Sequence, residues 1–313
     1  MPSDSSELYA AETRYTTQKS TLFMTACVLQ GSEVQYGMDS STLRLATYNI
    51  RFDNPTDPFP WQARRQGLAN LLLELNADVF GLQEVLAHQL SDLGQALPPY
   101  AYVGVGRGPN PDQHAPYTAR SGEHNPIFFR TKRFQLLDHG TFWLSPTPDI
   151  PGSQFERTSF PRIATWAELE DRASQQNFFV FNTHFPYEQD AGGEAARAFS
   201  AKVLLEGITQ IAGDADTVIM GDFNLTTHHE PDRLETYDLI REQFQDALEV
   251  AQKRQGPEET FFGFEVTNAG EYRIDYIFAH PSFSVLTYET VLAHNRTHYY
   301  SDHAPVVCDI SFS

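Results

Sequence analysis

One short stretch, Thr217-Val-Ile-Met-Gly-Asp-Phe-Asn224, constrains the fold most strongly, because an unbroken apolar run leads directly into polar side chains. Such a run indicates a strand buried on both faces, although periodicity alone does not distinguish it from a buried helix. On an extended chain Asp222 and Asn224 point to the same side. A carboxylate and a carboxamide are hard oxygen ligands of the kind that Mg²⁺, Mn²⁺ or Ca²⁺ accepts. Taken alone, the stretch is more typical of a strand that ends in an ordinary turn.

The same layout recurs along the chain, and this recurrence changes the interpretation. Several apolar runs end in an acid, an amide or an imidazole, and one run begins from them; the set is Asn49, Glu84, His184, Asp222, Asn224, Asp275, Asp302 and His303. If these run ends lie at one rim of a β core, they converge on an oxygen-rich site, which favours Mg²⁺ or Mn²⁺ over zinc. The chemistry expected there is water attack on a phosphoester. The metal would polarise a phosphoryl oxygen, and a histidine oriented by a carboxylate would remove a proton from water.

Hydrophobic periodicity divides the chain into a weakly patterned lead-in and one long patterned region. Residues 1–42 are polar and rich in Ser and Thr, which predicts a flexible or loosely packed N-terminal extension. Residues 43–313 are the predicted catalytic domain. Inside it, apolar residues at helical spacing predict helices from 61, from 86 and over 194–211, and one more marked by Leu234, Ile240, Phe244 and Leu248. The loops 104–125 and 144–161 are where we expect substrate specificity, because loops that overhang a rim carry function.

Charge and composition restrict the partners. The chain has 41 acidic and 22 basic residues, a net charge of −19, which counts against a broad surface for duplex nucleic acid. No apolar run reaches about 18 residues, so we expect no transmembrane segment. The two cysteines, Cys27 and Cys308, offer no disulfide framework and no cysteine-type zinc site. Without a convincing signal peptide, we expect a cytoplasmic protein, and we favour a monomer.

Six motifs carry a family resemblance. Thr47-Tyr-Asn-Ile-Arg51, Leu82-Gln-Glu84, Asn182-Thr-His184, Gly221-Asp-Phe-Asn224, Ile274-Asp-Tyr276 and Ser301-Asp-His303 resemble, in this order, the signatures of the endonuclease/exonuclease/phosphatase superfamily. That superfamily includes DNase I-like nucleases, abasic-site endonucleases, deadenylases, inositol polyphosphate 5-phosphatases and neutral sphingomyelinases. The resemblance covers residues 43–313. Further stretches, such as Gly104-Val-Gly-Arg-Gly108, are similar to uncharacterised bacterial and fungal members near the deadenylase and nocturnin-like branch.

The resemblance implies a fold, a cofactor and residue roles. The fold would be a four-layer α/β sandwich with two packed mixed β-sheets flanked by helices, and the cofactor Mg²⁺ or Mn²⁺. Glu84 would be the principal metal ligand, supported by Asn49 and Asp302. Among the catalytic residues, Asp222 would orient the attacking water, His303 would be held by Asp275, and His184 would contact phosphate or assist the leaving group. Which of Asp222 and His303 takes the proton stays open.

Four residues make up the expected substrate-binding set. By resemblance, Asn224 would hold a phosphate oxygen, and Asn182 belongs to the same motif as His184. Arg162 is either a surface arginine or a phosphate contact, and we favour the phosphate contact because a guanidinium matches phosphate geometry. For Arg51, a role at the substrate end of the site and a plain loop ion pair are equally consistent with the sequence.

Three functional hypotheses follow. The first is a metal-dependent phosphatase or phosphodiesterase that acts on a small phosphorylated substrate, which suits the acidic charge. The second is a nuclease or deadenylase that acts on single-stranded nucleic acid, for which the chain has ample aromatic residues but no evident basic groove. The third is a non-catalytic binding module on the same fold, which a missing acid or histidine in the motifs would favour; none is missing.

Overall fold

The computed structural model describes residues 42–109, 122–189, 191–225 and 235–312. In the described part of the chain, the strands form two sheets. The first sheet has seven strands in the order β10 (Lys253–Gln255), β12 (Phe283–Thr290), β13 (Val306–Phe312), β1 (Thr42–Asn49), β2 (Val79–Gln83), β4 (Ile127–Arg130) and β3 (Tyr100–Val103). The second has six, in the order β5 (Phe134–Trp143), β6 (Ile163–Asp171), β7 (Gln176–His184), β8 (Thr217–Asp222), β11 (Asp275–Ala279) and β9 (Gln245–Asp246).

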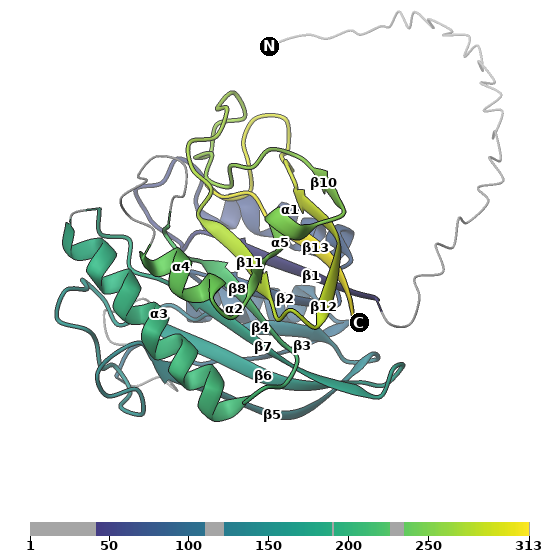
Figure 1. Cartoon of the computed structure of the whole chain (residues 1–313). Coiled ribbons are helices and arrows are strands. Elements are labelled where there is room, and N and C mark those ends of the chain that lie inside the picture. Colours follow the sequence, from purple (N-terminus) through teal and green to yellow (C-terminus); the bar gives the residue numbers. More distant parts are fainter. Residues whose placement is uncertain (1–41, 110–121, 190, 226–234, 313) are drawn as a thin grey trace, which may run out of the picture. The chain divides into compact units, whose positions relative to one another are not determined.

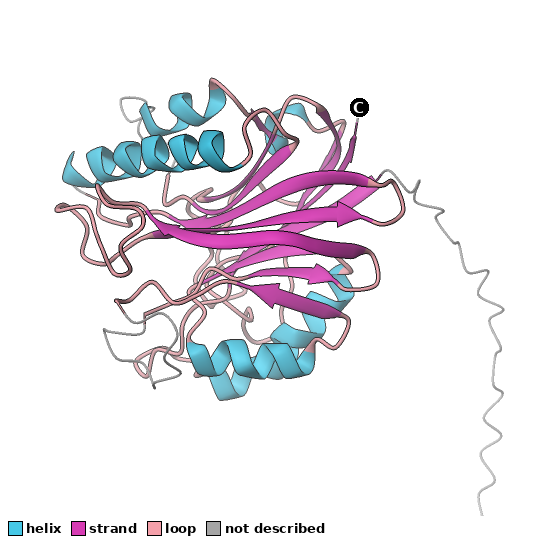
Figure 2. Cartoon of the chain, turned by 90° about the horizontal axis from the view of Figure 1, so that it is seen from below, coloured by secondary structure: helices cyan, strands magenta, loops and turns pink. Residues whose placement is uncertain are grey.

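Helices cover the outer faces of the two sheets, as Figures 1 and 2 show. The helices are α1 (Trp61–Leu75), α2 (Ala87–Ala96), α3 (Ala191–Ile211), α4 (Glu235–Arg241) and α5 (Ala247–Val250). One apolar cluster joins α1 and α2 to the first sheet, and another joins α3 and α4 to the second sheet. A third cluster fills the space between the sheets, with Leu45 and Val79 from one and Val180 and Val218 from the other. These layers confirm the predicted four-layer α/β sandwich with two mixed sheets.

The apolar run at residues 217–222 forms a buried strand, β8, as the sequence indicates. Every residue of β8 is buried, because β7 pairs with it in parallel on one side and β11 pairs antiparallel on the other. Gly221 has a φ of +153°, and a Cβ there would lie 2.1 Å from the carbonyl oxygen of Thr183. The close approach of β7 and β8 at the end of the strand therefore requires glycine.

One predicted helix is not continuous in the structure. The helix marked by Leu234, Ile240, Phe244 and Leu248 is divided into α4 and α5 by β9. Phe244 lies between these elements, because the next two residues pair with β11. Asp246 then caps α5, since its side chain accepts a hydrogen bond from the Leu248 N–H. Leu234 lies outside the described residues.

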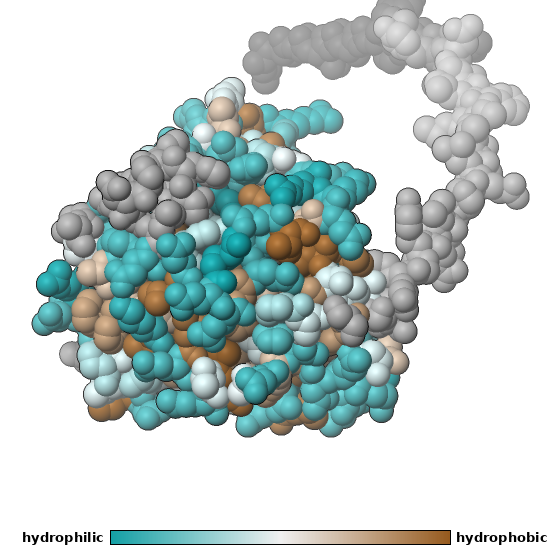
Figure 3. All heavy atoms as spheres, in the orientation of Figure 1, coloured by the Kyte–Doolittle hydropathy of each residue, from teal (hydrophilic) through white to brown (hydrophobic). Residues whose placement is uncertain are grey.

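Most of the predicted extension, residues 1–41, lies outside the described residues, and Thr42 already belongs to β1. Among the helices that are described, none combines the length and the apolar character needed to cross a membrane. The face in Figure 3 is mainly hydrophilic, with apolar residues in small groups.

Candidate active site

Three neighbouring strands of the second sheet bring polar side chains into one row. His184 ends β7, Asp222 ends β8 and Asp275 begins β11, and the strand register places Asp222 beside both of the others. The Nε2 atom of His184 lies 3.4 Å from Oδ2 of Asp222. All three side chains are buried. This row is a direct product of strand register, since residues that pair across strands have side chains on the same face.

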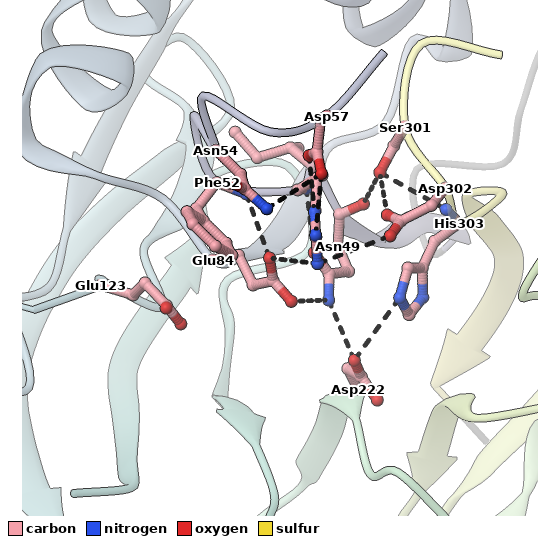
Figure 4. A network of polar contacts seen from close by, with 12 residues as sticks. Asn49, Phe52, Asn54, Asp57, Glu84, Glu123, Asp222, Ser301, Asp302 and His303 are labelled. Atoms are coloured by element: carbon pink, nitrogen blue, oxygen red, sulfur yellow. Dashed lines mark hydrogen bonds and ion pairs between the residues drawn. The ribbon is translucent and has the colours of Figure 1, made fainter. Parts of the chain in front are cut away.

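The first sheet contributes the facing half of the site. Asn49 ends β1, Glu84 directly follows β2, and Asp302 and His303 come just before β13. The amide Nδ2 of Asn49 donates to Oε1 of Glu84 (3.1 Å) and to Oδ2 of Asp222 (2.9 Å), so that one side chain joins the two sheets. Figure 4 shows these residues converging, as the sequence predicted for the run ends.

His303 is held by a carboxylate on the opposite sheet. Its Nδ1 lies 2.8 Å from Oδ2 of Asp275, and its Nε2 lies 3.8 Å from Oδ2 of Asp222. Burial alone lowers the pKa of His303, but Asp275, followed by Asp222 and Asp302, outweighs burial and raises the pKa to about 10. The pKa of Asp222 rises to about 7, mainly through burial and then through the charge of Asp275. His303 is therefore charged at neutral pH, and Asp222 lies near its titration point.

The backbone is unusual at three site residues. Arg51, Glu84 and Asn224 have φ values of 57°, 62° and 49°, in a region that side chains other than glycine seldom adopt. At Glu84 the conformation directs the carboxylate back to the Phe52 N–H, which donates to Oε2 at 3.0 Å. Backbone strain of this kind persists where the surrounding structure holds it, and it clusters at functional sites.

Arg51 lies between two of the predicted metal ligands. Its guanidinium forms a fork with Asp57 (2.8 and 3.0 Å), and its Nη1 lies 3.7 Å from Asp302 and 4.0 Å from Glu84. These carboxylates and Asp57 raise the pKa of Arg51 although burial lowers it. Both readings of Arg51 from the sequence thus have a structural counterpart, because it is a loop ion pair and also faces the site.

Arg162 is buried beside the row of strand ends. Its side chain is 4% exposed, and Nε and Nη1 have no hydrogen-bond partner among the described residues. Burial, and then the charge of Arg107, lowers its pKa to about 10. Burial also lowers the pKa of His184 well below its usual value, and Arg162 adds to the effect, so His184 is neutral. A buried guanidinium with two unpartnered nitrogens is a candidate anion site.

Arg107 and Glu123 form a pair that was not predicted from the sequence. The two side chains are buried and form a fork, with Nη2 and Nη1 of Arg107 at 2.9 and 2.8 Å from the Glu123 oxygens. Oε2 of Glu123 also lies 4.0 Å from Nδ1 of His184. Arg107 lies within the Gly104–Gly108 stretch that the resemblance singled out, but nothing in the sequence pairs it with Glu123.

Asn182 has a different environment from the other predicted substrate-binding residues. It is fully buried, and its Nδ2 donates to the carbonyl oxygens of Leu82 and Pro126 at 2.9 Å each. Its Oδ1 accepts a hydrogen bond from Gln83 at 2.7 Å. Asn182 therefore joins the two sheets beneath the site, and its substrate contact stays a prediction.

A single cavity of about 1170 Å³ collects these groups. Glu84, Asp302, Asp222, His303, His184 and Arg162 all line it. The volume far exceeds that of a phosphate group and lies slightly above the range of about 300–1,000 Å³ that is usual for small-molecule sites.

The donor set fits a hard divalent cation. The ligand atoms of Asp222, Asp275 and His303 lie within 4.8 Å of one another, and Oδ1 of Asp275 is buried without a hydrogen-bond partner. Glu84, Asn49 and Asp302 add oxygen donors on the side of the first sheet. Sulfur is absent from both groups, which suits Mg²⁺ or Mn²⁺.

Known proteins resemble this chain in sequence and in fold. Residues 46–303 match the profile of the Endonuclease/Exonuclease/phosphatase family. A structure of a protein of this family from Bacteroides thetaiotaomicron superposes with a TM-score of 0.77 and 33% identity, covering 87% of this chain and 98% of that one. A mannosyl-6-phosphatase from the same organism gives a TM-score of 0.75 and 32% identity, covering 86% of this chain and all of the other.

The curated relatives are more distant and longer. Nocturnin from Drosophila melanogaster is 24% identical over 286 residues, which cover 82% of this chain and 42% of nocturnin. Protein angel from the same fly is 25% identical, with 63% of this chain and 53% of the relative covered. The chain spans about half the length of these curated relatives.

Proposed function

The chain belongs to the endonuclease/exonuclease/phosphatase family, and we propose that it is a divalent-metal-dependent phosphoester hydrolase that acts on a small phosphorylated substrate. The observation that carries the proposal is the convergence of the Asp222–Asp275–His303 group, the Glu84 and Asp302 carboxylates and the unpartnered Arg162 on one cavity. The relative named as a mannosyl-6-phosphatase supports a small phosphate ester.

Glu84, Asn49 and Asp302 would hold Mg²⁺ or Mn²⁺, which supplies a Lewis acid that polarises a phosphoryl oxygen. Arg162 would pair with the phosphate. Asn224 donates one amide hydrogen to the carbonyl oxygen of Phe185 at 3.1 Å, and its second amide hydrogen is available to a phosphate oxygen.

The two steps of proton transfer are assigned to residues from different sheets: His303, just before β13, and Asp222, at the end of β8. Asp275 accepts a hydrogen bond from Nδ1 of His303, so Nε2 faces Asp222 and the cavity. Because the pKa of His303 is raised to about 10, its ring acts as a donor to phosphoryl oxygen or to the leaving group. Asp222, whose pKa is raised to about 7, orients the water and accepts its proton. His184, kept neutral, contacts the phosphate.

The test uses metal-stripped protein with Mg²⁺ or Mn²⁺ added back. Phosphate release from methyl phosphate and from a panel of small phosphate esters is compared for wild type, Glu84→Ala and His303→Ala. His139→Ala serves as a control, because His139 is exposed on β5. We expect release that depends on metal, is lost in the two site variants and is retained in the control. Release without added metal, or full activity of His303→Ala, would refute the mechanism.

A second candidate function has one observation in its favour. Nocturnin and the Ccr4 exoribonuclease subunit are among the sequence relatives, so we keep hydrolysis of single-stranded nucleic acid as the alternative. Shortening of oligonucleotides in the same assay, without action on small esters, would select it. The domain boundary at 43, the monomeric state and the cytoplasmic location stay predictions.

A further inference from the structure

The cavity has a limited supply of uncompensated positive charge. Three arginines line it among the described residues: Arg51, Arg107 and Arg162. Arg51 is paired in a fork with Asp57, and Arg107 in a fork with Glu123. Among the described residues Arg162 forms no comparable fork: Glu123, Glu188 and Asp222 attract its charge, but two of its nitrogens have no hydrogen-bond partner. The cavity wall therefore offers one guanidinium with donors still available to an anion.

The guanidinium of Arg162 lies in the wall of the same cavity as His184 and Asp222. Because these two residues face the reacting phosphate in the proposed mechanism, we assign Arg162 to the phosphate that is cleaved. A second phosphate elsewhere in the cavity would meet guanidinium groups that are already neutralised by acids. Burying an anion without a partner is costly.

The wall beyond Arg162 is aromatic. Phe160 and Tyr187 are 37% and 46% exposed although they line the cavity. The guanidinium of Arg107 lies 4.9 Å from the ring centroid of Phe160, and that of Arg162 lies 5.8 Å from the ring centroid of Tyr187. The Ser159 N–H donates to Glu188 at 2.7 Å, which joins the two loops that carry these rings. Exposed rings on a fixed wall suit the apolar face of a ring compound.

We propose that the substrate carries a single phosphate group on an uncharged ring skeleton, which packs on Phe160 and Tyr187. This inference rests on the proposed function and names its substrate class. Sugar phosphates and nucleoside monophosphates share this chemistry. Compounds with two or more phosphates, including oligonucleotides, do not.

The first experiment measures kcat/KM for hexose 6-phosphates, hexose 1,6-bisphosphates, nucleoside 5′-monophosphates, nucleoside 3′,5′-bisphosphates and methyl phosphate. We expect each single-phosphate ring compound to exceed its bisphosphate by about tenfold or more, since the second phosphate lacks a cation. Comparison of kcat/KM between the hexose phosphates and the nucleoside phosphates identifies which kind of ring the substrate carries. Bisphosphates that react as well as single phosphates would overturn the inference.

A charge change in the wall gives a sharper test. Glu123→Gln removes the acid that neutralises Arg107, so a second free guanidinium appears in the cavity. The ratio of kcat/KM for the bisphosphate to that for the single phosphate should rise several-fold. An unchanged ratio would refute the charge argument. A ratio is used because any general loss of activity in the variant cancels.

Tyr187→Ala tests the aromatic wall. Loss of a ring contact should raise KM for the ring substrates about two- to tenfold more than it raises KM for methyl phosphate. Tyr102→Ala is the matched control, because Tyr102 is 40% exposed on β3 and does not line the cavity. An equal rise in KM for methyl phosphate would refute the proposed packing of the substrate ring on Tyr187. Absence of metal-dependent release even from methyl phosphate would refute the proposed function instead.

Discussion

Arg64 on α1 provides the most demanding test of how the site is held together. Arg64 is 1% exposed, and among the described residues its hydrogen bonds go to backbone oxygens rather than to a carboxylate. All its donors bind backbone carbonyl oxygens: Phe59 (3.2 Å), Ile50 (2.5 Å), Tyr300 (3.0 Å), Arg51 (2.6 Å) and Phe52 (3.2 Å). The loop after β1 and the loop before β13 thus share one guanidinium.

The substitution Arg64→Lys keeps the charge but supplies only three donors. At least two of the five hydrogen bonds must be lost, and a hydrogen bond to a charged group contributes about 1.5–3 kcal/mol. We expect a loss of about 3 kcal/mol in the free energy of unfolding, at the lower end because water reaches some loop carbonyls. The same loops position Glu84 and Asp302, so Mn²⁺ affinity should fall about 10- to 100-fold, as for other residues that orient metal ligands.

Urea unfolding and calorimetric titration with Mn²⁺ measure the two effects. Arg65→Lys is the matched control, since Arg65 is the next residue, is half-exposed and pairs with Asp92 at 3.2 Å on the surface. It should change stability by less than about 0.5 kcal/mol. Wild-type Mn²⁺ affinity in a destabilised Arg64→Lys would show that Arg64 supports the fold alone. Stability within about 1 kcal/mol of wild type would refute the hydrogen-bond argument itself.

Three further predictions concern the second sheet. Thr260→Val should lower kcat about tenfold while Thr260→Ser keeps it, because the hydroxyl accepts two N–H groups at the start of β11; steady-state kinetics decides. Asp275→Asn should lower the pKa of His303 from about 10, as followed by NMR titration. The stability from that raised pKa is complete below about pH 6.5 and is lost as pH rises through 10, so the variant's deficit should shrink over this range. Gly221→Ala should destabilise the fold by more than about 3 kcal/mol, whereas Gly213→Ala, with open space around its Cβ, should cost about 1 kcal/mol in thermal unfolding.

The residues at the rim of the site could be predicted from the sequence for a physical reason. Buried strands appear in a sequence as apolar runs. The polar residue that ends such a run must lie where the sheet ends. Asn49, His184 and Asp222 were identified in this way, and the structure brings them together. The family resemblance then indicated the functional roles of these residues, which hydrophobic periodicity does not predict.

Other features depend on contacts between segments that are distant in sequence. The row of His184, Asp222 and Asp275 requires β11 to pair with β8, and no local pattern specifies that pairing. The same pairing interrupts the predicted helix around Phe244, because tertiary hydrogen bonds outweigh helical periodicity. The Arg107–Glu123 fork joins two ends of a loop, and such pairs are seen only in three dimensions.

The pairing of β1 with β13 fixes the order in which the site can be completed during synthesis. A nascent chain leaves the ribosome from its N-terminus, so β1 emerges more than 250 residues before its antiparallel partner. Until then one edge of β1 lacks its partner, and Asp302 and His303 have yet to be translated. Chains that end before Asp302 therefore lack this residue and His303, and one edge of β1 is open to pairing with another strand. The residues contributed by the two sheets come together only when β13 pairs with β1.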